Sequence, residues 1–183
     1  MFINEIKKIF SGDVDNSKET LLKYSHDTSL FEVEPKVVVF PKTVRDIQEL
    51  VKFVAKSKKD NTNPTISLVA RSGGTCMSGG ALGESIIVDF ARYFNHIKEI
   101  GEDYAIVEPG VYYRDFDKAT KEKGLFLPSY PASREVCAIG GMVNNNSGGE
   151  KFLYGKTENF VMEMKVVLSD GEECVFKPLN EEE

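Results

Sequence analysis

The sequence is poor in the side chains that bind metals or carry thiol chemistry. It has three cysteines, Cys76, Cys137 and Cys174, and two histidines, His26 and His96. The cysteine spacings match neither a zinc knuckle nor a C-x-x-C redox motif, and two histidines are too few for a histidine-based metal centre. We therefore expect no metal site and three unreactive cysteines. Both histidines are interpreted as structural, because neither stands in a recognisable catalytic constellation.

Long apolar runs and an excess of basic residues are also missing. No apolar stretch approaches the ~20 residues that a membrane helix needs, and the opening MFINEIKKIF lacks the uninterrupted apolar core of a signal peptide. The formal net charge of −6 argues against a nucleic-acid-binding surface, which would be basic. It leaves a bound nucleotide open, because a few backbone N–H groups can hold a pyrophosphate. We expect a cytoplasmic protein without a membrane span or a nucleic-acid partner.

The residues that are present have an ordinary globular composition, 41% hydrophobic and 28% charged, so disorder is expected only at the ends. Apolar periodicity predicts helices at 1–10, 44–58 and 113–123, a polar turn at 11–18, strands at 36–41, 66–70, 85–90, 96–100, 104–110 and 125–128, and a hairpin at 161–176. The helix at 44–58 is the most clearly marked, because Thr43 and Asp46 fit a capping box. This order predicts an α+β fold rather than a repeating βαβ chain.

The stretch RSGGTCMSGG at 71–80 concentrates glycine after a predicted strand. No lysine follows it as in a P-loop, and it leads into a strand rather than a helix, which excludes the Rossmann fingerprint. Small residues that adopt positive φ can turn successive N–H groups toward one anion. The alternative is a tight corner between two strands.

A second stretch, PSYPASREVCAIGGMVNNNSGGEKFLYGKTENFV at 128–161, contains two Gly-Gly pairs and an asparagine triplet. Segments of this length without regular structure are usually functional or disordered. Residues 144–147 could offer amide and hydroxyl groups to a ribose, a phosphate or a heterocycle. Two separated loops of this kind suggest a long ligand between them.

Residues 24 to 174 resemble the FAD-binding domain of the vanillyl-alcohol oxidase type, also called the PCMH type. The match is closest to the FAD-linked 2-hydroxy-acid dehydrogenases, which include D-lactate dehydrogenases and the glycolate oxidase flavoprotein subunit. The motifs that carry it, in the family's order, are Y-x-x-D at 24–27, VVVFP, VARSGGTCMSGGA, IIVDFARYFN, VEPGV, PSYPAS, IGGMVNNNSGG and YGKTENFVMEMKVVLSDG. The resemblance implies an α+β PCMH-type fold with two α/β subdomains and the cofactor between them.

The resemblance also implies which residues bind FAD. They are Arg71, Ser72, Gly73, Gly74, Thr75, Cys76, Ser78 and Gly79 in the first loop, then Pro131, Ser133, Ala138, Gly140, Gly141, Asn145, Gly148 and Val161. Thr75 stands where members with covalent FAD often carry histidine, and Cys137 is offset by one place from the cysteine of the second loop. The resemblance therefore implies non-covalent FAD. Tyr112, Tyr113 and Phe116 are interpreted as packing residues rather than as a flavin stack.

The expected domains are an N-terminal helical segment at 1–23, an FAD-binding PCMH-type domain at 24–177 and an acidic tail at 178–183. We expect the family's substrate domain to be absent from this sequence, so no catalytic residue is assigned. The expected function is the FAD-binding part of a flavin-dependent oxidoreductase that oxidises a 2-hydroxy acid such as lactate or glycolate. One alternative is a non-catalytic FAD-binding fragment or subunit whose active site another chain completes. The other is a flavin reductase of the UDP-N-acetylenolpyruvoylglucosamine reductase branch.

Overall fold

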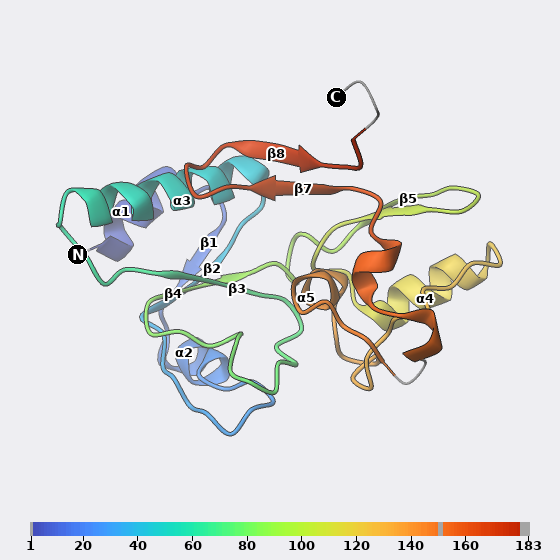
Figure 1. Cartoon of the computed structure of the whole chain (residues 1–183). Coiled ribbons are helices and arrows are strands. Elements are labelled where there is room, and N and C mark those ends of the chain that lie inside the picture. Colours follow the sequence, from blue (N-terminus) through green and yellow to red (C-terminus); the bar gives the residue numbers. More distant parts are fainter. Residues whose placement is uncertain (1, 150–151, 180–183) are drawn as a thin grey trace.

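The computed structural model describes residues 2–149 and 152–179 (Figure 1). The helices are α1 (Phe2–Ile9), α2 (Lys18–Tyr24), α3 (Val44–Lys59), α4 (Tyr113–Lys121) and α5 (Ile139–Asn144), with short 3-10 helices η1 (Phe152–Tyr154) and η2 (Thr157–Phe160). The strands are β1 (Asp13–Asp15), β2 (Val37–Phe40), β3 (Leu68–Arg71), β4 (Ile86–Asp89), β5 (Ile97–Ile100), β6 (Ala105–Val107), β7 (Met164–Val167) and β8 (Glu173–Phe176). Residues 180–183 of the expected acidic tail lie outside the described residues.

The first subdomain is a four-stranded sheet in the order β1-β2-β4-β3. β2, β4 and β3 are parallel, and β1 runs antiparallel to β2. Successive residues of β2 point to opposite faces, so Val39 packs with α1 and α3 in one core while Val38 packs with Tyr24 of α2 in another. Because the three parallel strands share a direction, their carboxyl ends meet at one edge of the sheet, at Phe40, Arg71 and Asp89.

The second subdomain has a core of its own. The β5–β6 hairpin, α4 and α5 enclose the buried residues Val111, Tyr113, Phe116, Tyr130, Cys137, Ile139 and Met142. The prediction that Tyr113 and Phe116 are packing residues is confirmed. The β7–β8 hairpin lies along α3 (Figure 1), and its turn at Gly171 has a φ of +82°. Two subdomains built from mixed helices and strands agree with the expected α+β class.

Most predicted elements are confirmed, but three are wrong. Residues 125–128 are not a strand, because α4 uses their backbone: the N–H of Leu125 donates to the carbonyl of Thr120, and the Leu127 carbonyl accepts the Tyr113 hydroxyl at 2.8 Å. The polar turn at 11–18 contains β1, which pairs with β2 through backbone atoms. The stretch at 128–161 contains α5, η1 and η2.

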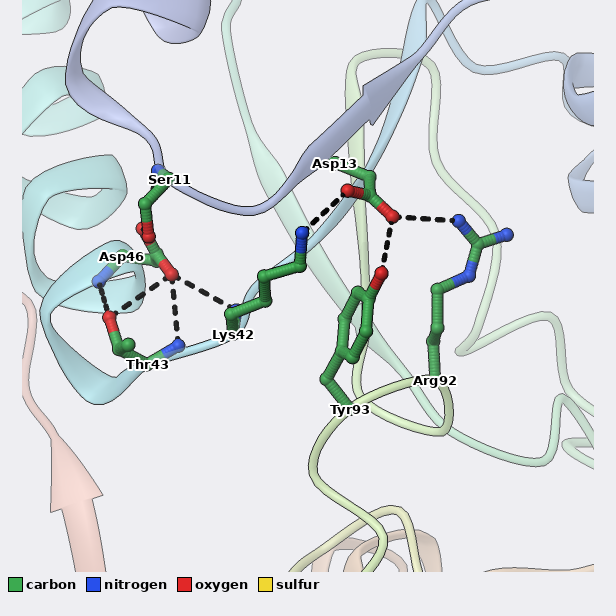
Figure 2. Close-up of polar contacts among 7 residues, drawn as sticks. All are labelled: Ser11, Asp13, Lys42, Thr43, Asp46, Arg92 and Tyr93. Atoms are coloured by element: carbon green, nitrogen blue, oxygen red, sulfur yellow. Dashed lines mark hydrogen bonds and ion pairs between the residues drawn. The ribbon is translucent and has the colours of Figure 1, made fainter.

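Two carboxylates hold the segment around β1 at the edge of the sheet where the parallel strands end (Figure 2). Asp46, only 3% exposed, accepts hydrogen bonds from the backbone N–H groups of Ser11, Lys42 and Thr43 at 2.7–3.0 Å. Asp13 accepts hydrogen bonds from the Tyr93 hydroxyl at 2.6 Å and from the Lys42 ammonium at 2.9 Å. The capping box of α3 therefore also anchors the chain that precedes β1.

Candidate cofactor site

The first loop, residues 72–80, leaves the sheet at the carboxyl end of β3. Gly74 and Gly79 have φ values of +65° and +78°, the left-handed region that glycine adopts without a steric penalty. The loop is half-exposed, with Met77 84% exposed at its tip. The glycines predicted to allow unusual backbone turns do so at two of their positions.

The second loop, residues 131–138, contacts the first loop at Gly73. A β-carbon built on Gly73 would lie 2.5 Å from the Val136 carbonyl oxygen and 3.4 Å from the Ala138 nitrogen. The first loop and the start of α5, which follows the second loop, also share one acceptor. The carbonyl oxygen of Pro109 accepts the Ser72 hydroxyl at 3.3 Å and the Gly140 N–H at 2.8 Å. The structure thus brings together two segments that are some sixty residues apart in the chain.

α5 begins directly after the second loop. Its start is fixed by tertiary hydrogen bonds, because the Ile139 N–H donates to the Val111 carbonyl and the Tyr113 N–H donates to the Cys137 carbonyl, both at 2.9 Å. Gly141 in its first turn is exposed, and a β-carbon there would have no atom within 4 Å. Space for a ligand therefore remains beside the backbone of Gly141.

The other residues that the resemblance assigns lie on both sides of α5. Pro131 and Ser133 form the turn of the second loop, where their carbonyls accept the N–H groups of Arg134 and Val136 at 3.0 and 2.9 Å. Asn145 caps the end of α5 and is exposed, and Gly148 is exposed too.

Val161 stands apart from the two loops. It ends η2, whose Thr157 joins the segment after α5 through a 2.9 Å hydrogen bond from its N–H to the Ser147 carbonyl.

The cysteines near the two loops differ in character. The Cys76 sulfur accepts the Gly80 N–H at 3.3 Å and lies 3.2 Å from the Ser78 hydroxyl oxygen. The Ser78 contacts, followed by the Gly80 N–H, lower the pKa of the Cys76 thiol below its usual value. Cys137 is buried in the second core, and this burial raises the pKa of its thiol. Of these two thiols, only that of Cys76 is partly exposed and has its thiolate form stabilised.

The Arg71 side chain reaches the end of α2 and the segment that follows it. Its Nη1 and Nη2 donate to the carbonyls of Tyr24 and His26 at 3.3 and 2.7 Å, and its guanidinium lies 5.0 Å from the centre of the Tyr24 ring. The Tyr24 hydroxyl donates to Asp89 at 2.9 Å. The sequence assigned roles to neither Tyr24 nor Asp89. The signals are the Y-x-x-D motif at 24–27, which contains Tyr24, and the IIVDFARYFN motif, which contains Asp89; both serve in the sequence only as part of the resemblance.

The histidines pair with carboxylates outside the two loops. The His26 Nε2 lies 3.5 Å from a Glu32 oxygen, and the His96 Nδ1 lies 2.8 Å from a Glu108 oxygen. Within the described part of the chain, no group of three or more His, Cys, Asp or Glu side chains is arranged to hold a metal ion. None of the helices in residues 2–149 and 152–179 has the length and apolar character needed to cross a bilayer.

The chain is similar in sequence to known dehydrogenase and oxidase proteins. Over 182 residues the chain is 31% identical to the D-2-hydroxyglutarate dehydrogenase of Escherichia coli (strain K12), an alignment that covers 97% of this chain and 18% of that protein. Over 163 residues it is 34% identical to the glycolate oxidase subunit GlcD of Bacillus subtilis (strain 168), with 86% of this chain and 33% of that protein covered. The chain therefore spans a third or less of the length of these curated relatives.

The fold is shared with more distant solved structures. An alkyldihydroxyacetonephosphate synthase superposes with a TM-score of 0.80 at 20% identity, covering 98% of this chain and 35% of that chain. p-Cresol methylhydroxylase superposes with a TM-score of 0.72 at 21% identity, covering 94% and 34%. These likenesses confirm the PCMH-type fold. The family model described as the FAD binding domain matches residues 35–177, and the chain belongs to this family of FAD-binding domains.

Proposed function

We propose that the first loop, the second loop and the start of α5 hold the diphosphate of FAD between the two subdomains. The observation that carries the proposal is the contact of Gly73 with Val136 and Ala138. It joins two loops that both permit close approach to the backbone, at the edge where the parallel strands end. Ligands of sheets with parallel strands bind outside these carboxyl ends.

The residues present fit this cofactor. The open space beside Gly141 would be narrowed by a β-carbon. Gly74 and Gly79 have positive φ, a conformation that allows backbone N–H groups to turn toward an anion. The residues that would hold FAD are Ser72, Gly73, Gly74, Thr75, Cys76, Ser78, Gly79, Pro131, Ser133, Ala138, Gly140, Gly141, Asn145, Gly148 and Val161. Bound FAD supplies the capacity to accept a hydride equivalent, while these residues bind and orient it.

Non-covalent attachment is part of the proposal. Thr75 offers no imidazole or thiol to the flavin. Cys137 is 3% exposed, and its raised pKa keeps the sulfur protonated and poorly nucleophilic at neutral pH. The free thiols at 76, 137 and 174 also support a reducing, cytoplasmic location.

We propose that the complete protein oxidises a 2-hydroxy acid. The support is the set of similar proteins, whose names specify D-2-hydroxyglutarate, glycolate and D-lactate as substrates. No residue of this chain is assigned as a general base. In the proposed division of labour, these residues bind the cofactor, and a further domain or chain completes the substrate site.

The test begins with the purified chain mixed with FAD. We expect a yellow complex whose flavin is released into the supernatant by acid precipitation, because no covalent bond holds it. A colourless protein after gel filtration would overturn the FAD proposal, and flavin retained in the precipitate would overturn non-covalent attachment. Dye reduction by D-lactate, glycolate and D-2-hydroxyglutarate is then measured on the full-length protein. Flavin binding without reduction by any of them would leave a binding module and reject the substrate class.

A further inference from the structure

We propose that Arg71 is a positioning residue that holds the first loop in its FAD-binding shape from beneath, by joining it to residues 25–33, rather than a ligand of the FAD phosphates. We call residues 25–33 the strap. The inference rests on the proposed FAD site and adds to it a part of the molecule, the strap, that lies outside the two loops.

The guanidinium of Arg71 lies close to both Tyr24 and Gly74. The Tyr24 ring lies on one side, with its centre 5.0 Å from the guanidinium carbon. Gly74 lies close by, because a β-carbon there would stand 2.6 Å from Nη2 and 2.9 Å from Nε. Two of the guanidinium donors are used on the carbonyls of Tyr24 and His26. The planar, forked geometry of arginine suits two carbonyls and a ring at once, which lysine cannot reproduce.

The strap contacts the first loop at two further points. The Thr28 hydroxyl donates to the Cys76 carbonyl at 3.1 Å, and the Phe31 ring lies 3.0 Å from the position of a β-carbon on Gly79. Figure 1 shows the blue segment after α2 beside the green segment after β3. Arg71 thus contacts the loop at Gly74, and the strap contacts it at residues 76 and 79. These positions include both loop glycines with positive φ.

The strap is itself fixed to the sheet. Its ends are joined by a 2.9 Å hydrogen bond from the Val33 N–H to the Ser25 carbonyl. At its start, the Tyr24 hydroxyl donates to Asp89, and Asp89 is the register partner of Arg71 in the β3–β4 ladder. The contacts that support the first loop therefore run from Arg71 in β3 to Tyr24, and from Tyr24 back to the sheet at Asp89 in β4.

The charge of Arg71 is partly desolvated in this position. Burial lowers the pKa of the Arg71 guanidinium, and the carboxylates of Asp27 and Asp89 offset only part of this effect. One oxygen of Asp27 is buried without a hydrogen-bond partner among the described residues. The Arg71 guanidinium thus has acceptors within the protein, the carbonyls of Tyr24 and His26, and two carboxylates that act on its charge.

The experiment compares FAD dissociation constants of wild-type protein and four variants between 20 and 500 mM NaCl, values chosen to vary ionic screening widely. Arg71→Ala and Arg71→Lys test the brace, Thr28→Val tests the strap without a change of charge, and Arg45→Ala on the exposed start of α3 is the control. We expect Arg71→Ala to weaken FAD binding about tenfold or more, by a factor that does not change with salt. Arg71→Lys should restore little of it, and Thr28→Val should cost about threefold, as for one hydrogen bond.

A phosphate ligand at position 71 behaves differently. Arg71→Lys would then keep most of the affinity, and the loss in Arg71→Ala would shrink as salt rises, because screening weakens an ion pair. Either result overturns the inference, as would an unchanged affinity in Thr28→Val. Arg45→Ala should bind FAD as the wild type does.

Hydrogen exchange in FAD-free protein separates this inference from the FAD proposal. We expect Arg71→Ala to speed amide exchange in residues 72–80 more than in β2 and β4. If the wild type binds no FAD but exchange responds in this way, the FAD proposal fails and the brace stands. Unchanged exchange in residues 72–80 would overturn the brace, whatever the FAD result. Global unfolding would speed exchange in all strands, in which case Arg71→Lys and Thr28→Val give the answer.

Discussion

Gly73 and Val136 hold the two loops at contact distance: a β-carbon on Gly73 would stand 2.5 Å from the Val136 carbonyl oxygen. Because this neighbour is backbone, it cannot rotate away as a side chain would. The Gly73→Ala variant must therefore push the loops apart, at a cost of about 1–3 kcal/mol. For a chain of this size we expect the melting temperature to fall by about 2–10 °C, together with weaker FAD binding. Thermal scanning and FAD titration check this. A melting temperature and affinity equal to those of wild type would contradict it.

Gly141→Ala, in contrast to Gly73→Ala, is expected to leave the stability of the protein unchanged or to increase it. A β-carbon at Gly141 meets nothing within 4 Å, and alanine favours a helix over glycine by about 1 kcal/mol. The melting temperature should stay constant or rise slightly. FAD affinity should nevertheless fall severalfold if the cofactor approaches this backbone, as isothermal titration would show. Unchanged affinity would place the cofactor away from α5.

Asp46→Ala should destabilise the first subdomain by about 2–4 kcal/mol. The change removes the capping box of α3 and leaves the N–H groups of Ser11, Lys42 and Thr43 without their acceptor. Urea denaturation followed by circular dichroism measures the loss. Asp46→Asn keeps one carbonyl oxygen and is expected to lose less. Equal losses in the two variants would show that these hydrogen bonds do not account for the effect.

The free energy of unfolding should fall in acid, and protonation of Asp13 should account for part of this fall. The hydrogen bond from Tyr93, followed by that from Lys42, lowers the pKa of Asp13 to about 2, whereas an unfolded aspartate titrates near 3.9. The unfolded chain therefore takes up this proton first as the pH drops. The stabilisation is complete above about pH 4 and is lost as the pH falls through about 2.

The Asp13→Asn variant tests this sign. Its unfolding free energy should decrease less steeply than that of wild type between pH 4 and 2, and the difference at neutral pH should stay below about 1 kcal/mol, because the side chain is 39% exposed. Denaturation series at several pH values measure both. Asp103→Asn in the β5–β6 turn is the control. A steeper acid dependence in Asp13→Asn than in wild type would reverse the assignment.

Cys76 should react with iodoacetamide before Cys137 does. The lowered pKa of Cys76 increases its thiolate fraction near pH 7.5, while burial raises the pKa of Cys137 and shields it. Peptide mass spectrometry of briefly labelled protein ranks the two sites, and Cys76→Ser provides the control. Faster labelling at Cys137 would contradict the structure around both thiols. Added FAD should slow labelling at Cys76 if the first loop holds the cofactor.

The elements that the sequence predicts well are those whose residues decide their own structure. α3 was predicted because Thr43 and Asp46 cap it and its apolar residues recur at helical spacing, and β2 and β4 because they are short apolar runs rich in β-branched residues. α5 was missed because Gly140 and Gly141 disfavour a helix. Its first turn is instead held by the carbonyls of other segments.

In the candidate site, too, some features follow from their own residue types and others depend on the rest of the fold. The glycine loops could be recognised because glycine marks positions of close backbone approach. The strap could not, because Arg71 binds the carbonyl of His26 in the strap and that of Tyr24 just before it, and every residue type carries a carbonyl. β1 escaped prediction for a related reason, since its residues Asp13–Asp15 pair with β2 through backbone atoms while their composition favours a turn.

The carbonyl of Pro109 has a consequence for how the gap between the loops is set. It accepts the Ser72 hydroxyl from one loop and the Gly140 N–H from the start of α5. The ring of proline fixes only the φ angle of its own residue, so the direction of this carbonyl is set by its two hydrogen-bond donors. Ser72 and Gly140 thus share one backbone oxygen as their reference point, and a displacement of residue 109 would move both sides of the site together.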